Sequence, residues 1–229
     1  FVSNLLIAGS AISLGTRYGI KTDPDNTNKN ITPSENQTGK TVTEPSRQVP
    51  VLAETDVLVI GGGPSGTAAA IAASRTGAET WLVERYNHLG GLWTGGLVLP
   101  LLSTHAVDRH KQRKQVIFGI GGEMAKRLQS LGMAINEVNP TVDPEAAKYV
   151  LEEMIRESGV KMLYHTWCTD VIMDGRTIKG VLIENKSGRM AILAKVVIDC
   201  TGDGDIFHHS GDNYEVMNYA IGLNHRLGN

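Results

Sequence analysis

The sequence has little cysteine, little net charge and no long apolar run. Cys168 and Cys200 are its two cysteines, too few for a disulfide framework and without the spacing of a zinc site. We expect both to be buried thiols. The formal net charge of −2 gives no reason to expect nucleic acid as a partner. No apolar stretch reaches the roughly 20 residues of a membrane-spanning helix, so we expect no stable membrane span.

The first fifty residues carry no pattern of a packed domain. Residues 1–20 begin with Phe1 and contain the moderately apolar stretch FVSNLLIAGSAISLG. This stretch resembles the part of a twin-arginine export signal that follows the two arginines, which predicts a signal remnant and a periplasmic or other extracytoplasmic location. The alternative is an N-terminal helix docked on a cytoplasmic protein. Residues 21–51 are polar and rich in Pro, Asn and Thr, which predicts a linker.

Glycine is abundant, with 26 residues, and it gathers in four clusters at 61–66, 90–96, 119–122 and 202–204. Clustered glycines indicate backbone that passes close to ligands rather than general flexibility.

The first cluster has the surroundings of a nucleotide-binding turn. Residues 56–60 (DVLVI) predict a buried parallel strand, and an alanine-rich helix is expected over 67–76. Between them the glycines permit a tight turn, a close approach to a pyrophosphate, and packing of helix on strand. The helix start offers amide groups and partial positive charge to the phosphates. The residues expected at the pyrophosphate are Gly61, Gly63, Pro64, Ser65 and Gly66.

An acidic residue completes this unit. A second strand is expected over 79–83, and Glu84 follows it, 23 positions after Gly61. A carboxylate there can accept hydrogen bonds from both ribose hydroxyls and repels a 2′-phosphate. Strand, glycines, helix, strand and acid in register favour an adenine dinucleotide over a chance glycine-rich turn.

The segment ERYNHLGGLWTGGL, from Glu84 to Leu97, bears on the kind of dinucleotide. It resembles the segment of two-dinucleotide-binding-domain flavoproteins in which the acid is followed by a second glycine doublet. The resemblance implies FAD as the cofactor, with Gly90 and Gly91 beside the pyrophosphate and ribityl chain. Two further alternatives stay open, a surface loop and an NAD-binding dehydrogenase. The resemblance places Arg85 and Thr94 at the cofactor as well.

The rest of the chain predicts two helices and an antiparallel meander. Asp143 is the expected N-cap of the second helix, with Pro144 at its first position. The turns at 174–175 and 185–188 have hairpin chemistry. The helices are expected over 119–132 and 143–158, and the strands over 160–165, 168–173, 177–184, 189–193 and 196–198.

This order is similar to the glutathione-reductase-like layout of the FAD-dependent oxidoreductase family. The resemblance covers residues 56–215 and implies an α/β fold with a Rossmann-like FAD-binding domain over 52–216, a parallel sheet and a β-meander. It also implies that Thr201, Gly202 and Asp203 lie beside the flavin and that Val171 binds adenine through its backbone. Residues 217–229 are then the start of a substrate domain or a tail near a cleavage point. The fold is incomplete without a C-terminal segment, which we expect a second polypeptide to supply.

The function implied is hydride transfer between a small organic substrate and FAD. Since the sequence has no second G-x-G-x-x-G for NAD(P)H, we expect the flavin to exchange electrons with its partners directly. His105 is a candidate to take a proton and Arg226 to clamp a carboxylate. His88 is a candidate for covalent attachment of FAD. A non-catalytic nucleotide-binding subunit of a split complex remains an alternative function.

The spacing of Asp203 and Asp205 invites a metal site. The further oxygen ligands of a calcium loop are missing from the sequence around them, so we expect no metal.

Overall fold

A computed structural model describes residues 41–215 and Asn224 of the chain. The chain divides into two units, Phe1–Arg47 and Gln48–Asn229. The expected signal remnant at 1–20, most of the expected linker and Arg226 lie outside the described residues. In the described part of the first unit, residues 41–47 are exposed and have no secondary structure.

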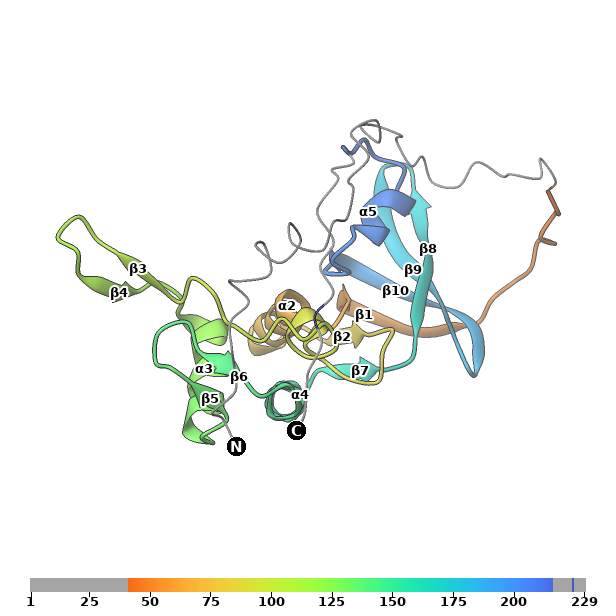
Figure 1. Cartoon of the computed structure of the whole chain (residues 1–229). Coiled ribbons are helices and arrows are strands. Elements are labelled where there is room, and N and C mark those ends of the chain that lie inside the picture. The colour runs from red at the N-terminus through yellow and green to blue at the C-terminus, as the bar shows by residue number, and fades with distance from the viewer. Residues whose placement is uncertain (1–40, 216–223, 225–229) are drawn as a thin grey trace, which may run out of the picture. The chain divides into compact units, whose positions relative to one another are not determined.

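The second unit is built on a mixed six-stranded sheet with the order β7-β2-β1-β10-β9-β8 (Figure 1). Neighbouring strands run parallel from β7 to β10, and the pairs β10–β9 and β9–β8 are antiparallel. The sheet therefore has the expected α/β arrangement of a parallel part joined to a meander. Its strands are β1 (Val51–Ile60), β2 (Thr80–Val83), β7 (Lys161–Leu163), β8 (Trp167–Asp174), β9 (Thr177–Asn185) and β10 (Gly188–Asp199).

The expected strands 189–193 and 196–198 are one continuous strand, β10. The separate strands were wrong because residues 194–195 carry no turn-forming residue and the backbone stays extended through them. The first half of β10 pairs with β9, and β1 pairs along it from Val51–Ala191 to Ile60–Asp199. The pairing with β10 also extends β1 at its N-terminal end, so β1 begins at Val51, five residues earlier than expected.

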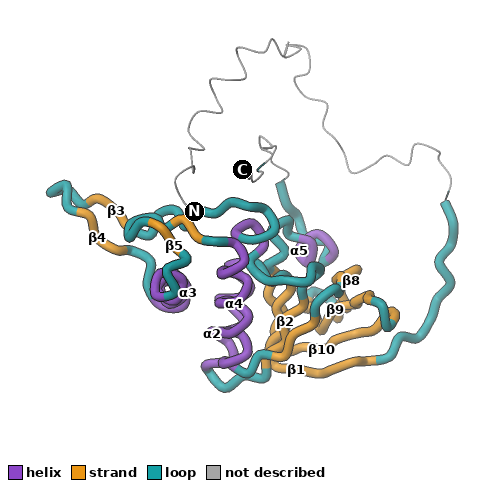
Figure 2. The backbone as a smooth tube through the Cα atoms, turned by 60° about the horizontal axis from the view of Figure 1, so that its bottom comes forward, coloured by secondary structure: helices purple, strands orange, loops and turns teal. Residues whose placement is uncertain are grey.

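Helix α2 packs on one face of the sheet and α4 lies side by side with α2 (Figure 2), while α3 packs against α2 and α4. Asp143 caps α4 as expected, since its Oδ1 accepts hydrogen bonds from the backbone amides of Glu145 and Ala146 at 2.9 and 3.0 Å. Gly159 ends α4 with φ +74°. The helices are α2 (Pro64–Arg75), α3 (Gly119–Ser130) and α4 (Pro144–Ser158).

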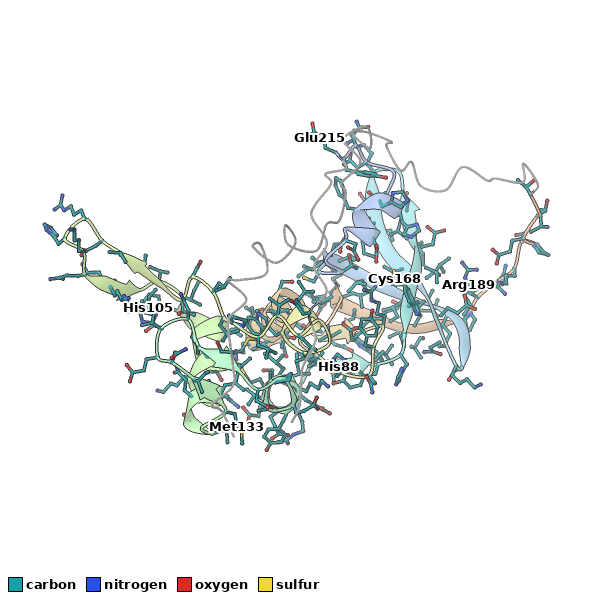
Figure 3. All side chains as sticks on the ribbon, in the orientation of Figure 1. His88, His105, Met133, Cys168, Arg189 and Glu215 are labelled. Atoms are coloured by element: carbon teal, nitrogen blue, oxygen red, sulfur yellow. The ribbon has the colours of Figure 1, made fainter. Side chains whose placement is uncertain are left out.

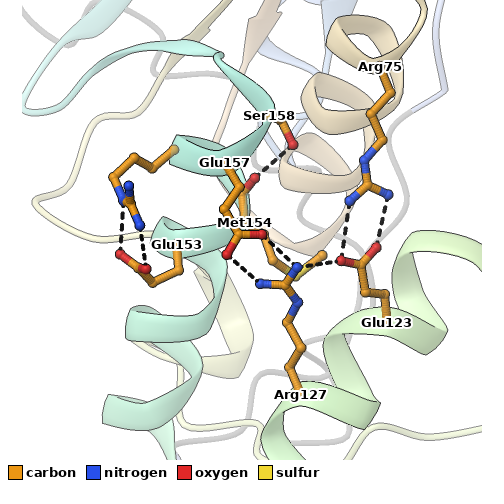
Figure 4. Close-up of polar contacts among 8 residues, drawn as sticks. Arg75, Glu123, Arg127, Glu153, Met154, Glu157 and Ser158 are labelled. Carbon is orange, nitrogen blue, oxygen red and sulfur yellow. Dashed lines mark hydrogen bonds and ion pairs between the residues drawn. The ribbon is translucent and has the colours of Figure 1, made fainter.

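Ion pairs tie these helices together at the surface (Figure 4). Arg127 on α3 contacts Glu123 and Glu157, each at 2.7 Å, and so links α3 to α4. Arg75 on α2 contacts Glu123 at 2.9 Å.

The remaining elements are short. The hairpin of β3 and β4 projects from the rest of the second unit (Figure 1). Among the described residues, no helix combines the length and apolar character needed to cross a bilayer. The short elements are η1 (Gly91–Trp93), β3 (His105–Val107), β4 (Arg113–Gln115), β5 (Ala134–Ile135), β6 (Thr141–Val142) and α5 (Asp205–His209).

Candidate functional site

The glycine turn between β1 and α2 is packed against the backbone that follows β10. Gly61 has φ +96°, and a Cβ there would lie 2.3 Å from the carbonyl oxygen of Cys200. A Cβ at Gly66 would lie 1.8 Å from the carbonyl oxygen of Gly61. These two positions admit no side chain, because backbone atoms cannot move aside as a flexible side chain can. The turn is therefore as tight as a nucleotide-binding turn requires.

The start of α2 is open toward the space above the turn. Gly63 is the N-cap, and no side chain in the described part of the chain caps it. A Cβ at Gly63 would meet no atom within 4 Å. Pro64 occupies the first helical turn. The helix start thus presents amide groups and free space together, which suits a phosphate group.

The second glycine doublet lies against the first cluster. The Gly90 amide donates to the carbonyl oxygen of Gly62 at 2.9 Å, and a Cβ at Gly91 would lie 3.1 Å from the Cα of Gly63. The structure therefore brings together two glycine clusters that are more than twenty residues apart in sequence.

Thr94 supports this doublet from inside the protein. It is buried, with 2% exposure, and its hydroxyl donates to the carbonyl oxygen of Leu89 at 2.6 Å. A Cβ at Gly90 would lie 2.4 Å from its methyl group. Thr94 fixes the loop that the sequence resemblance expected to run toward the flavin.

Glu84 connects β2 to the glycine turn. Its side chain is 5% exposed; Oε2 accepts from the Gly62 amide at 2.6 Å and Oε1 from the Tyr86 amide at 2.8 Å. An ionised carboxylate has roughly four acceptor positions, so two remain for ribose hydroxyls. The sequence predicted that Glu84 binds the ribose of the ligand. The structure shows in addition that Glu84 binds the backbone of Gly62 and Tyr86.

The segment after β10 is organised by Asp199, a residue that the sequence analysis missed. Its Oδ1 accepts from the Thr201 amide and hydroxyl at 3.0 and 2.8 Å, and its Oδ2 accepts from the Ile206 and Phe207 amides at 3.0 and 3.1 Å. No N-cap pattern signals this role in the sequence, because Asp199 lies six residues before α5 and the N-cap itself is Gly204.

Thr201 is also used within this segment. Its hydroxyl oxygen accepts from the amides of Gly204 and Asp205, each at 3.0 Å. Gly202 has φ +89° and open space at its Cβ position, and Asp203 is exposed. In the described part of the chain, no group of three or more His, Cys, Asp or Glu side chains is arranged to hold a metal ion.

The two candidate histidines, His88 and His105, lie in different parts of the structure. His105 lies at the base of the projecting hairpin, well away from His88 (Figure 3). His88 stacks on Tyr86 with ring centres 6.0 Å apart, and a Cβ at Gly95 would lie 2.9 Å from its Cε1. The structure brings His88 to the glycine loops and places His105 elsewhere.

Val171 lies on β8, the edge strand of the sheet. Its amide donates to Oδ1 of Asp170 at 2.8 Å.

Both cysteines are free, and both are partly buried where buried thiols were expected. Burial raises the pKa of the Cys168 thiol to about 12 and also raises the pKa of Cys200. Both thiols therefore stay protonated at neutral pH, which makes them weak nucleophiles.

Comparison with solved structures supports the fold. A geranylgeranyl bacteriochlorophyll reductase-like protein from Thermoplasma acidophilum aligns with a TM-score of 0.50 and 17% identity, over 72% of this chain and 44% of that one. L-proline dehydrogenase from P. horikoshii aligns with a TM-score of 0.50 and 15% identity, over 74% of this chain and 58% of that one. At these identities the likeness concerns the fold alone.

Comparison of sequences identifies relatives and a family. A thiamine thiazole synthase of Methanococcus vannielii is 30% identical over 66% of this chain and 57% of its own length. That of Pyrococcus horikoshii is 29% identical over 66% of this chain and 58% of its own length. The chain thus spans somewhat over half the length of these relatives. The family described as FAD dependent oxidoreductase matches residues 56–223. The chain therefore belongs to the FAD-dependent oxidoreductase family, whose cofactor is FAD.

Proposed function

We propose that this protein transfers hydride between a small organic substrate and FAD. The observation that supports this most is the pairing of the two glycine clusters above the open start of α2, next to a buried carboxylate. This combination fits a dinucleotide with a pyrophosphate between a ribose and a second half.

Each part of the site has a role in this proposal. The amides at the start of α2 bind the pyrophosphate, and Gly63 leaves the backbone accessible to it. Glu84 accepts hydrogen bonds from the ribose and keeps the turn in place. Gly90 and Gly91 let the loop run close to the ligand without a side chain between them. Bound FAD supplies the hydride acceptor or donor of the reaction.

Protein groups would orient the substrate and move its proton. We keep His105 as the candidate base and Arg226 as the candidate carboxylate clamp. His105 lines a cleft of about 330 Å³ between the hairpin and α3, so its participation requires a substrate that reaches from this cleft toward the glycine loops. Its Nδ1 lies 3.1 Å from the hydroxyl of Thr104, which orients the ring.

A further chain segment completes the sheet in this proposal. The pairing of β10 with β9 stops at Leu193–Gly180, whereas its pairing with β1 continues to Asp199. On the side away from β1, residues 194–199 of β10 face no strand within the described part of the chain. Val196 on this stretch is 51% exposed. An open edge with an exposed apolar residue suits a strand from a second polypeptide or from more of the same one.

The test is purification from the native source, followed by absorption spectroscopy and native mass spectrometry. We expect the oxidised flavin spectrum, bleaching on anaerobic addition of a reductant, and release of FAD on denaturation. Mass spectrometry also reveals a covalent link to His88 or a second polypeptide. Extraction of NAD in place of FAD would contradict the proposal and favour a dehydrogenase. Bound FAD that no donor reduces in the complete complex would favour a non-catalytic subunit.

We also propose that the protein is exported. The support is the resemblance of residues 1–20 to an export signal. Fractionation of source cells with an antibody tests this: we expect the protein outside the cytoplasm, and a purely cytoplasmic protein contradicts it.

A further inference from the structure

The cleft between the hairpin and α3 holds two opposite charges. Lys126 on α3 and Glu137 in the segment between β5 and β6 both line this cleft of about 330 Å³. In the described part of the chain, no ion pair includes either side chain. Elsewhere on the same helix the charges are paired, as at Arg127 with Glu123 and Glu157. The cleft therefore keeps an ammonium group and a carboxylate available to a ligand.

The rest of the lining is partly apolar. Ile117 after the hairpin, Ala125 on α3 and Pro140 all line the cleft. His105, at the base of the hairpin (Figure 3), lines it as well. Small-molecule sites measure roughly 300–1,000 Å³ and combine apolar walls with a few polar groups. The cleft has this composition and lies at the small end of that range, so it suits a small ligand with an apolar part.

Hydrogen bonds hold the walls of the cleft without a ligand. Thr104 is 8% exposed; its amide donates to Oδ1 of Asn139 at 3.0 Å, and the Asn139 amide donates to its hydroxyl at 2.9 Å. The carbonyl oxygen of Thr104 accepts from the Val116 amide at 2.9 Å. The Gln129 side chain makes a long hydrogen bond of 3.5 Å to the carbonyl oxygen of Glu137. The hairpin, α3 and the segment after β5 are thus linked around the cleft, and a preformed site loses little conformational entropy when it binds.

The two charges decide which ligand fits. Lys126 attracts a carboxylate, but Glu137 would repel a ligand that carries negative charge alone. Glu137 attracts an ammonium group, but Lys126 would repel a ligand that carries positive charge alone. A molecule with both charges meets a complementary partner for each, and the apolar residues can receive an uncharged hydrocarbon part. Apolar amino acids have this chemistry.

We propose that the cleft binds a small apolar amino acid, with its carboxylate at Lys126 and its ammonium group at Glu137. The hydrocarbon part of the ligand packs on the apolar wall. This site lies apart from the glycine loops, so binding to it does not require bound FAD. In naming the substrate class for the cleft that contains His105, the inference rests on the proposed function; as a binding site it stands by itself.

The test is isothermal titration calorimetry on the purified full chain with three probes of matched shape. L-leucine carries both charges, isocaproate lacks the ammonium group, and isoamylamine lacks the carboxylate. The variants are Lys126→Met and Glu137→Gln, each of which removes one charge from an exposed position. The control is Lys186→Met, which removes an exposed ammonium group from the turn between β9 and β10. Circular dichroism confirms that each variant is folded.

We expect L-leucine to bind the wild type about fivefold more tightly than either analogue, because ion pairs at exposed positions each contribute modestly. Lys126→Met should remove the advantage of L-leucine over isoamylamine and keep its advantage over isocaproate. Glu137→Gln should do the reverse. Lys186→Met should match the wild type for all three probes.

Equal affinity of the wild type for the three probes, or no binding of L-leucine, would overturn the proposal. An equal loss of all three probes in both variants would also overturn it, since this indicates general damage to the cleft. A loss in Lys186→Met would do the same, since it indicates a nonspecific effect of charge.

Flavin absorption separates this proposal from the proposed function. Binding of L-leucine without bleaching of the flavin supports the binding site and counts against an amino acid as the substrate. A protein that contains no flavin but binds L-leucine contradicts the proposed function alone.

Discussion

The glycine region and the β3–β4 hairpin hold their backbones by different means. In the glycine region the backbone contacts backbone directly, as at Gly61, Gly66 and Gly90. At the hairpin base the contact is made by side chains: the Thr104 amide donates to Asn139 Oδ1 at 3.0 Å, and the Asn139 amide donates to the Thr104 hydroxyl at 2.9 Å. Glycine is required where a Cβ would overlap backbone atoms, as at Gly61 and Gly66, whereas the contact between Thr104 and Asn139 involves residue types that are common in loops. The close backbone packing of the glycine region can therefore be recognised in the sequence, and the side-chain contact at the hairpin base cannot.

The largest effect is expected from Gly66→Ala. The new Cβ would overlap the carbonyl oxygen of Gly61, so the turn must shift, at a cost of about 3 kcal/mol, and FAD binding should be lost. The matched control is Gly63→Ala, where a Cβ meets nothing within 4 Å and stability should stay close to that of the wild type. Thermal unfolding and cofactor content measure both. Equal stability of the two variants would contradict the packing described here.

A smaller effect is expected from Glu84→Gln. One carboxylate oxygen becomes an NH₂ group and faces an amide donor, of Gly62 or Tyr86, so a buried hydrogen bond is lost. The cost should be about 1–3 kcal/mol in stability, accompanied by weaker FAD binding. Urea unfolding and FAD titration check this, with Glu145→Gln on the surface of α4 as the control. Wild-type stability of Glu84→Gln would show that these two hydrogen bonds contribute little to the free energy of unfolding.

The ion pairs among α2, α3 and α4 should contribute less, and their contribution should depend on pH. The hydrogen bond from Arg75 lowers the pKa of Glu123, and the hydrogen bond from Arg127 lowers the pKa of Glu157. A group whose pKa is lower in the folded state stabilises fully above its unfolded value and loses that contribution as the pH falls through the folded value. Glu123→Gln should therefore lower the melting temperature slightly at pH 7 and not below the folded pKa. A pH-independent difference would contradict this account.

The smallest effect is expected in the hairpin. Arg113 is exposed on β4, so Arg113→Ser should change stability by no more than about 0.5 kcal/mol and leave FAD affinity unchanged. A large loss of FAD affinity would show that the hairpin influences the glycine region, and would contradict the view that the two regions are independent.

The same contrast explains which features the sequence predicted. The strand, turn, helix, strand and acid between β1 and Glu84 follow from local patterns, and the structure has all of them. The helix α4 was predictable from its N-cap, Asp143, and from Pro144 at its first position. In each case residues close together in sequence determine the element.

Other features depend on partners distant in sequence. The N-terminal extension of β1 exists because β10 lies beside it from Ala191 to Asp199. Thr94 and Thr201 were predicted to lie at the cofactor, which stays a prediction; the structure adds that their hydroxyls bond to the backbone of their own loops. A threonine does not reveal from sequence whether its hydroxyl will face a ligand or a neighbouring peptide group.

The bonds of Glu84 have a consequence for how the cofactor is acquired. Because Gly62 and Tyr86 hold the carboxylate from both sides, folding of the chain alone sets the shape of the turn. Little conformational entropy then remains to be lost when the nucleotide arrives. The chain should therefore fold first and bind the nucleotide afterwards. A refolded polypeptide should bind the nucleotide when it is added after refolding, and the nucleotide should dissociate without unfolding of the protein.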